Sequence, residues 1–188
     1  MSEKKLHALS PLKGLNVTEG ATSITEENSS SIVSIAFTEE NKQELNKQLN
    51  SQFDLEIPVP GKVSRQGNML ALLGLQGDMC FLVSSEHWLD PVSYVSSRLG
   101  QCAYYTDQSD SWAIVSIKGA LCLPALQRLC PVDISPESFS SSSVARTLME
   151  HLSVIIEQPA NNHFRLYSAR SSANDFAHAL CTALQSVA

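Results

Sequence analysis

The feature that most constrains the fold is a pair of short apolar segments joined by a tight turn and followed at once by an amphipathic segment. Residues 69–75 and 79–83 have the length and composition of strands, and Gly77 opens a two-residue turn between them. Residues 90–100 then read as a helix capped by Asp90, with proline at the first helical position and glycine at the end. Such a hairpin buries one face against a helix, which is typical of an α+β fold.

A strand and a helix precede this hairpin. Residues 32–37 are β-branched and apolar, which predicts a strand. Apolar side chains then recur every four residues from Leu45, which predicts a helix with its N-cap at Thr38. We expect a short strand at 55–57 and a turn-rich connection at 61–68.

The second half of the chain repeats this order. Its expected elements are strands at 102–106 and 112–117, a helix at 120–129, strands at 144–156 (with a break near His151) and 164–169, and a last helix capped by Ser171 or Ser172. Hairpins that alternate with single helices are typical of the ferredoxin-like unit. We therefore predict an α+β fold of two ferredoxin-like β-α-β-β-α units, residues 32–100 and 101–188, that share antiparallel sheet.

Residues 1–31 have the pattern of an arm and a linker that precede both units. Ser10-Pro11 and Gly14 interrupt any helix, and residues 22–31 are almost all Thr, Ser, Glu or Asn. We expect this stretch to be ordered only where it docks on something else.

The composition excludes several classes of partner. The chain has 188 residues and a net charge of −6 without a basic run, which argues against nucleic acid and anionic membranes. Apolar residues make up 43% and charged residues only 17%, so the chain can bury a core and part of its surface is expected to be covered. No apolar stretch is long enough for a signal peptide or a membrane helix. Five cysteines without a CxxC pair predict free thiols in the cytoplasm and no structural zinc.

The sequence offers no self-contained catalytic constellation. No two of the five histidines have metal-ligand spacing on a helix, no glycine-rich phosphate loop occurs, and no serine lies in a nucleophile elbow. Cys130 is placed at a helix C-terminus, which disfavours a thiolate. Trp88 and Trp112 could stack a ring but are more typical of core or interface aromatics, and Arg146 and Arg170 could bind a carboxylate or form ion pairs. We predict no catalytic residue and no metal site, assign no cofactor-binding residue, and favour an interaction subunit over an enzyme.

One set of motifs resembles a known family. In order, these are Thr106-Asp107-Gln108-Ser109-Asp110, a strand that ends at Gly119, Leu126-x-x-Leu129-Cys130-Pro131-Val132-Asp133, Phe139, Ala145-Arg146-Thr147-Leu148, Phe164-x-Leu166 and Ala169-Arg170-Ser171. Their order and spacing resemble the gamma subunit of heterotetrameric sarcosine oxidase, closely over residues 80–188 and loosely over 1–79. The chain departs from the family at Ala120, where proline is usual, and at Leu123, where arginine is usual. These departures fit a divergent branch or a related demethylating oxidase.

The resemblance implies a role inside a larger complex. The family's complex oxidatively demethylates sarcosine to glycine, with hydrogen peroxide and formaldehyde or 5,10-methylenetetrahydrofolate as products. FAD, FMN, NAD, zinc and tetrahydrofolate would be held by other subunits, and the partners would be the alpha, beta and delta subunits, mainly alpha. The gamma subunit resembles the folate-binding fold of the glycine-cleavage aminomethyltransferase and is not the seat of the chemistry.

Three alternatives stay open at this point. The chain could be a subunit of a related N-methyl amine demethylase. It could also be a stand-alone folate-binding one-carbon protein, in which case Asp107 or Asp133 would contact the pterin. An orphan enzyme with a spatially assembled site has no positive support in the sequence.

Overall fold

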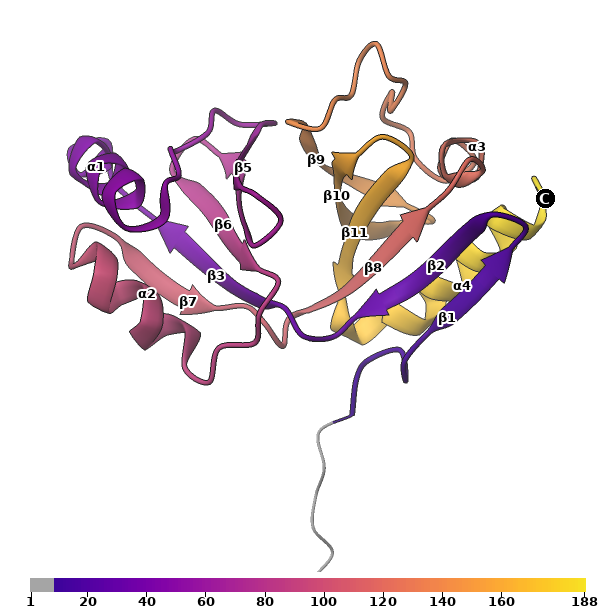
Figure 1. Cartoon of the computed structure of the whole chain (residues 1–188), viewed down its shortest axis with the longest axis horizontal. Helices are drawn as coiled ribbons and strands as arrows, with labels where there is room; N and C mark the ends of the chain where they lie inside the picture. Colours follow the sequence, from indigo (N-terminus) through magenta and orange to yellow (C-terminus); the bar gives the residue numbers. More distant parts are fainter. Residues whose placement is uncertain (1–8) are drawn as a thin grey trace, which may run out of the picture.

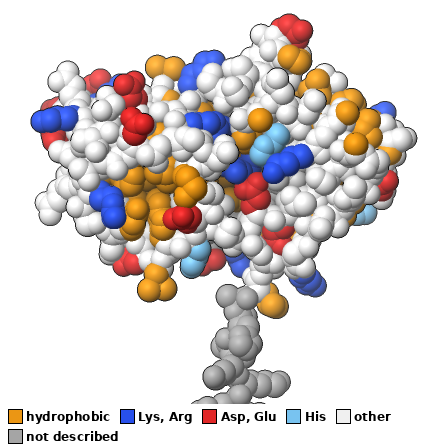
Figure 2. Space-filling view, in the orientation of Figure 1, with side chains coloured by type: hydrophobic (Ala, Val, Ile, Leu, Met, Phe, Trp, Pro, Cys, Tyr) orange, Lys and Arg blue, Asp and Glu red, His pale blue; other side chains and the backbone are white. Residues whose placement is uncertain are grey.

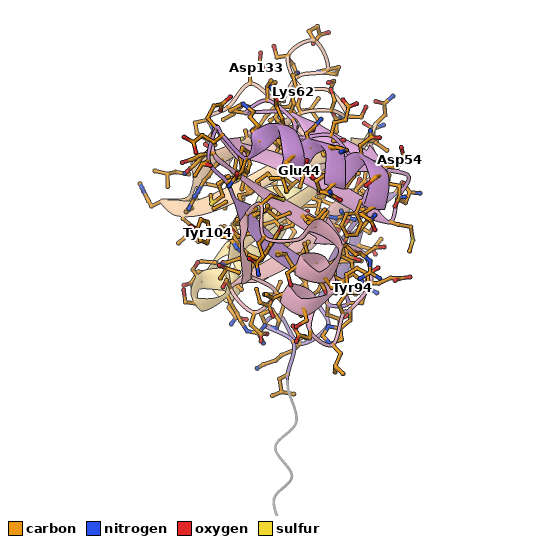
Figure 3. The ribbon with its side chains drawn as sticks, turned by 90° about the vertical axis from the view of Figure 1, so that its left-hand side faces the viewer. Glu44, Asp54, Lys62, Tyr94, Tyr104 and Asp133 are labelled. Atoms are coloured by element: carbon orange, nitrogen blue, oxygen red, sulfur yellow. The ribbon has the colours of Figure 1, made fainter. Side chains whose placement is uncertain are left out.

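The first unit is built on a five-stranded antiparallel sheet. The computed structural model describes residues 9–188. Within it, the elements of this unit are β3 (Ser31–Ala36), α1 (Lys42–Phe53), β4 (Val63–Gln66), β5 (Leu70–Gln76), β6 (Met79–Ser84), α2 (Pro91–Leu99) and β7 (Tyr104–Asp107), with strand order β4-β5-β6-β3-β7. Leaving out β4, the chain order is β-α-β-β-α-β, which is the ferredoxin-like order. The predicted unit of residues 32–100 ends before β7, which was expected in the second unit but pairs with β3 in this sheet. Helices α1 and α2 lie on the outer face of this sheet (Figures 1 and 3).

The second unit is built on a six-stranded sheet that takes strands from both ends of the chain. Its elements are β1 (Asn16–Glu19), β2 (Thr22–Glu27), β8 (Trp112–Lys118), α3 (Cys122–Leu126), β9 (Val144–Met149), β10 (Leu152–Ala160), β11 (His163–Ala169), a 3₁₀ turn (Arg170–Ser172) and α4 (Ala173–Gln185). The strand order is β1-β2-β8-β11-β10-β9, and every pairing is antiparallel. Strand β2 therefore occupies the place beside β8 that β7 occupies beside β3 in the first unit.

The two sheets face each other, with helices covering their outer faces (Figure 1). Side chains alternate between the two faces of each central strand. In β8, Ile114 points between the sheets and Val115 points toward α3 and α4; in β11, Tyr167 and Leu166 divide in the same way. Three apolar clusters result, one under each set of helices and one between the sheets. None of the helices between residues 9 and 188 is long and apolar enough to cross a membrane.

Several expected local structures are confirmed. The Asp90 carboxylate accepts a hydrogen bond from the Ser93 backbone N–H at 3.0 Å, and Gly100 ends α2 with φ of 72°. The chain breaks between β9 and β10 at Glu150 and His151, which both adopt a left-handed conformation with φ of 49° and 67°. The five cysteines are free thiols.

Other expected local structures are wrong. Helix α1 begins at Lys42 after Asn41, so Thr38 is not its N-cap, and residues 55–57 form no strand. The connection at 61–68 contains strand β4. Helix α3 covers only five residues and not the predicted 120–129. Pro124 fits within its first turn, and after Leu126 the chain continues to Cys130 in turns whose hydrogen bonds span three or four residues. Ser172 precedes α4 but its hydroxyl donates to the Ala169 carbonyl oxygen and caps no helical N–H.

The expectation of a linker over residues 22–31 is also wrong. Residues 22–27 form β2, which pairs along β8 from Ser23 with Lys118 to Glu27 with Ile114. Two side chains explain the order: Ile24 is fully buried, and the buried Thr22 hydroxyl accepts the Leu121 N–H at 3.0 Å. Residues 1–8 of the predicted arm lie outside the described residues.

Candidate functional site

A cleft of about 360 Å³ opens where the two units meet. It is bounded by the turn between β4 and β5, the end of β8, the end of β10 and the start of β11. Its walls include Arg65, Met69, Lys118, His163 and Arg165. Figure 2 shows Lys, Arg and His side chains gathered near the centre of this face, between the two halves of the molecule.

Beneath the cleft lies a carboxylate that has no contact with solvent. Glu157 on β10 is fully buried, and its side chain accepts hydrogen bonds from the Tyr167 hydroxyl at 2.5 Å, from Arg165 Nη1 at 3.3 Å and from Arg65 Nη2. Arg65 belongs to the first unit and Glu157 to the second, so this ion pair joins the two units. Burial of a charge is tolerated only with such partners.

Two neighbours of Glu157, Tyr167 and Arg165, keep their ordinary protonation states. Burial, and then the charge of Glu157, raises the pKa of Tyr167 well above its usual value, so the hydroxyl stays protonated and donates. Burial alone would lower the pKa of Arg165, but contacts with Tyr167, Glu27 and Glu157 outweigh this effect and raise it. Arg165 Nε lies 2.9 Å from a Glu27 carboxylate oxygen. Arg165 therefore stays charged.

His163 lies at the edge of the cleft as a neutral ring. Burial, followed by the positive charges of Lys118 and Arg165, lowers its pKa to about 4. Its Nε2 lies 2.8 Å from the Ser116 hydroxyl oxygen. This serine is only 1% exposed, so it is a hydrogen-bond partner of His163 rather than a nucleophile that substrate could reach.

The residues that the sequence singled out lie elsewhere. Trp88 stacks on Tyr94 at 4.3 Å, and Trp112 meets Phe81 edge-on at 6.0 Å between the sheets, so both are packed aromatics. Arg170 pairs with exposed Asp110 at 3.2 Å, and Arg146 is exposed on edge strand β9. Burial raises the pKa of the Cys130 thiol.

The two aspartates considered for a pterin contact are not brought together. Asp107 ends β7 and accepts the Ser109 N–H at 2.9 Å. Asp133 lies in the exposed loop after α3, where hydrogen bonds from Ser138 and Ser135 lower its pKa. Neither residue lines the cleft between the units. Among residues 9–188, no cluster of three His, Cys, Asp or Glu side chains could hold a metal ion.

Sequence reasoning missed the polar cluster around Glu157. The available signal was a charged or hydroxyl side chain on one face of an otherwise apolar strand. On β10, Glu157 lies two positions after Ile155 and so on the same face. On β11, Arg165 and Tyr167 alternate with Phe164 and Leu166. Polar side chains at positions that face another sheet must pair with each other. This pattern predicts a cluster but not its partner Arg65, which comes from a segment expected to be a loop.

Comparison with known proteins identifies the fold. No protein-family model matches the chain, and no curated protein matches its sequence. Among solved structures, the chain is similar to a chain of the heterotetrameric sarcosine oxidase from Corynebacterium sp. U-96, in complex with pyrrole 2-carboxylate. The TM-score is 0.79 at 18% identity, over 91% of this chain and 87% of that chain.

The fold is that of this sarcosine oxidase chain. The chain is also similar to the glycine cleavage system aminomethyltransferase T from Bartonella henselae, with a TM-score of 0.60 at 11% identity, over 87% of this chain and 46% of that chain. It thus spans less than half of the aminomethyltransferase. The fold resemblance predicted from the sequence is confirmed for both proteins.

Proposed function

We propose that this chain is the gamma-type subunit of a heterotetrameric oxidase that demethylates sarcosine or a related N-methyl amine. The observation that carries the proposal is the match to a chain of such an oxidase over 91% of one chain and 87% of the other, at a TM-score of 0.79. The two chains are therefore nearly equal in length, and the match is not to a fragment of a larger catalytic chain.

In this proposal the chain packs against larger subunits, mainly alpha, and carries out no chemistry itself. The flavins, NAD, zinc and tetrahydrofolate belong to the other subunits. The state of the thiols supports this role, because burial raises the pKa of Cys80, Cys122, Cys130 and Cys181 and makes each a poor nucleophile at pH 7. The arginines of the cleft are likewise engaged with Glu27 and Glu157.

Co-purification tests the proposal. The tagged full chain is expressed together with the alpha, beta and delta subunits that the proposal names as its partners. We expect a stoichiometric complex that contains flavin and forms hydrogen peroxide when sarcosine or another N-methyl amine is added, and a stable interface of more than about 1,000 Å². A chain that elutes alone, while the other subunits assemble without it and are fully active, contradicts the proposal.

Exposed apolar side chains allow the contact surface to be mapped in the same experiment. Leu89, beside Trp88, is 97% exposed, and Leu148 on edge strand β9 is 58% exposed. Neither side chain belongs to an apolar core cluster, so glutamate at either position should leave the fold intact. A variant that folds but no longer co-purifies marks the contact surface.

A stand-alone folate-binding protein is the second candidate. The cleft between the units and the fold shared with aminomethyltransferase T favour it. Calorimetry on the isolated chain separates the two functions. Heat on addition of tetrahydrofolate supports folate binding. No heat at about millimolar ligand, together with co-purification, supports only the subunit role.

A further inference from the structure

The cleft between the units holds hydrogen-bond donors that have no acceptor among residues 9–188. Arg65 donates a hydrogen bond from Nε to the Ser141 carbonyl oxygen at 3.3 Å and one from Nη2 to Glu157. Its Nη1 has no partner among the described residues. Arg165 donates its Nη1 to Glu157, and its Nε lies 2.9 Å from a Glu27 carboxylate oxygen, which leaves Nη2 without a partner among the described residues. Neither of these two nitrogens is among the fully buried atoms without a hydrogen-bond partner, and both arginines line the cleft and are partly exposed.

Lys118 adds a third cation at the same place. It ends β8, is exposed, and forms no ion pair with any residue between 9 and 188. The charges of Arg65 and Arg165 are balanced by Glu157 and Glu27, and His163 is neutral at pH 7. The cleft therefore carries one net positive charge on a protein whose net charge is −6.

We propose that this cleft binds a small monocarboxylate. One negative charge balances the excess cation, and the planar pair of carboxylate oxygens matches the free edges of the guanidinium groups. Met69, Pro159 and Ala160 form an apolar part of the wall, and a volume of about 360 Å³ has room for a short apolar body attached to the carboxylate. Glu157, which itself accepts a hydrogen bond from Tyr167, holds both arginines from below, so little ordering is needed when the ligand binds.

Benzoate, its neutral analogue benzamide, and chloride are suitable probes for the full chain. We expect benzoate to bind at pH 7 in low salt and to shift the amide NMR resonances of residues 67–70 and 160–165. Benzamide should not bind, and chloride should compete only weakly. Failure of benzoate to bind at about 50 mM overturns the proposal, as does equal binding of benzamide, which would show that the carboxylate is not recognised.

A matched pair of lysine variants locates the site. Lys118→Met removes the unpaired cation and keeps the length of the side chain, whereas Lys62→Met removes an exposed lysine that does not line the cleft (Figure 3). Benzoate affinity should fall about tenfold or more in the first variant and stay unchanged in the second. Equal affinity in both variants contradicts the proposal. The proposal does not depend on the oxidase role, because these measurements use the chain alone and co-purification does not enter them.

Discussion

Removal of the buried carboxylate by Glu157→Ala should destabilise the protein strongly. Three donors lose their acceptor, and two of them are guanidinium groups whose charges then face each other between the sheets. A hydrogen bond to a charged group contributes about 1.5–3 kcal/mol, so three of them set an upper bound near 9 kcal/mol. Relaxation and entry of water reduce this to the ~3–5 kcal/mol typical of a broken buried ion pair. For a chain of 188 residues, this corresponds to a fall in Tm of about 10 °C.

Urea denaturation and calorimetry of the purified chain measure this effect. Glu39→Ala is the matched control, because this glutamate pairs with Lys42 at 3.3 Å while 82% of its side chain is exposed, and the pair should contribute about 0.5 kcal/mol or less. Glu157→Gln retains the shape of the side chain and an acceptor for Tyr167. Its decrease in the free energy of unfolding should lie between that of Glu157→Ala and that of Glu39→Ala. A loss of less than about 1 kcal/mol in Glu157→Ala would show that the cluster does not hold the two units together.

Three further results are expected. The pKa of His163 is about 4 in the folded chain and 6.5 ordinarily, so the unfolded state binds the proton more readily. Urea titrations should show that the free energy of unfolding falls as the pH drops from about 6.5 to 4. The fall should be smaller in His163→Gln. Gly119 has φ of 125°, and a Cβ there would lie 2.4 Å from the Ala21 carbonyl oxygen, so Gly119→Ala should cost at least about 1–3 kcal/mol by calorimetry whereas Gly77→Ala, with open space around it, should cost far less. Burial raises the pKa of Cys80 to about 12, so a thiol reagent followed by mass spectrometry should label the half-buried Cys102 first, and early labelling of Cys80 would contradict its burial.

Local signals predicted the parts of the fold that depend on neighbours in the sequence. The hairpin of β5 and β6 and the helix between Asp90 and Gly100 follow from turn and capping residues, because their geometry is decided within a few residues. Strand β2 was missed for the opposite reason. Its Thr and Ser side chains are compatible with either a loop or a strand, and only pairing with β8, some ninety residues further along, decides between them.

The candidate cleft could not be predicted for a related reason. Glu157 on β10 and Arg65 on β4 are 92 residues apart in sequence, and their pairing depends on how two sheets are stacked. A buried charge between apolar strands shows that a partner exists, but it does not show which segment supplies it. The free donors that make the cleft a candidate binding site become visible only after every paired atom has been assigned.

The position of β2 has a consequence for how the protein is made. Residues 31–107 contain every element of the first unit and can collapse while the rest is still being translated. Strand β2 leaves the ribosome earlier, yet the strand it pairs with begins at Trp112, and the helix that covers their sheet ends at Gln185. The amino-terminal hairpin of β1 and β2 therefore cannot join its sheet until β8 has been made, and that sheet is not covered until α4 is complete, so this half becomes resistant to proteases after the first unit does.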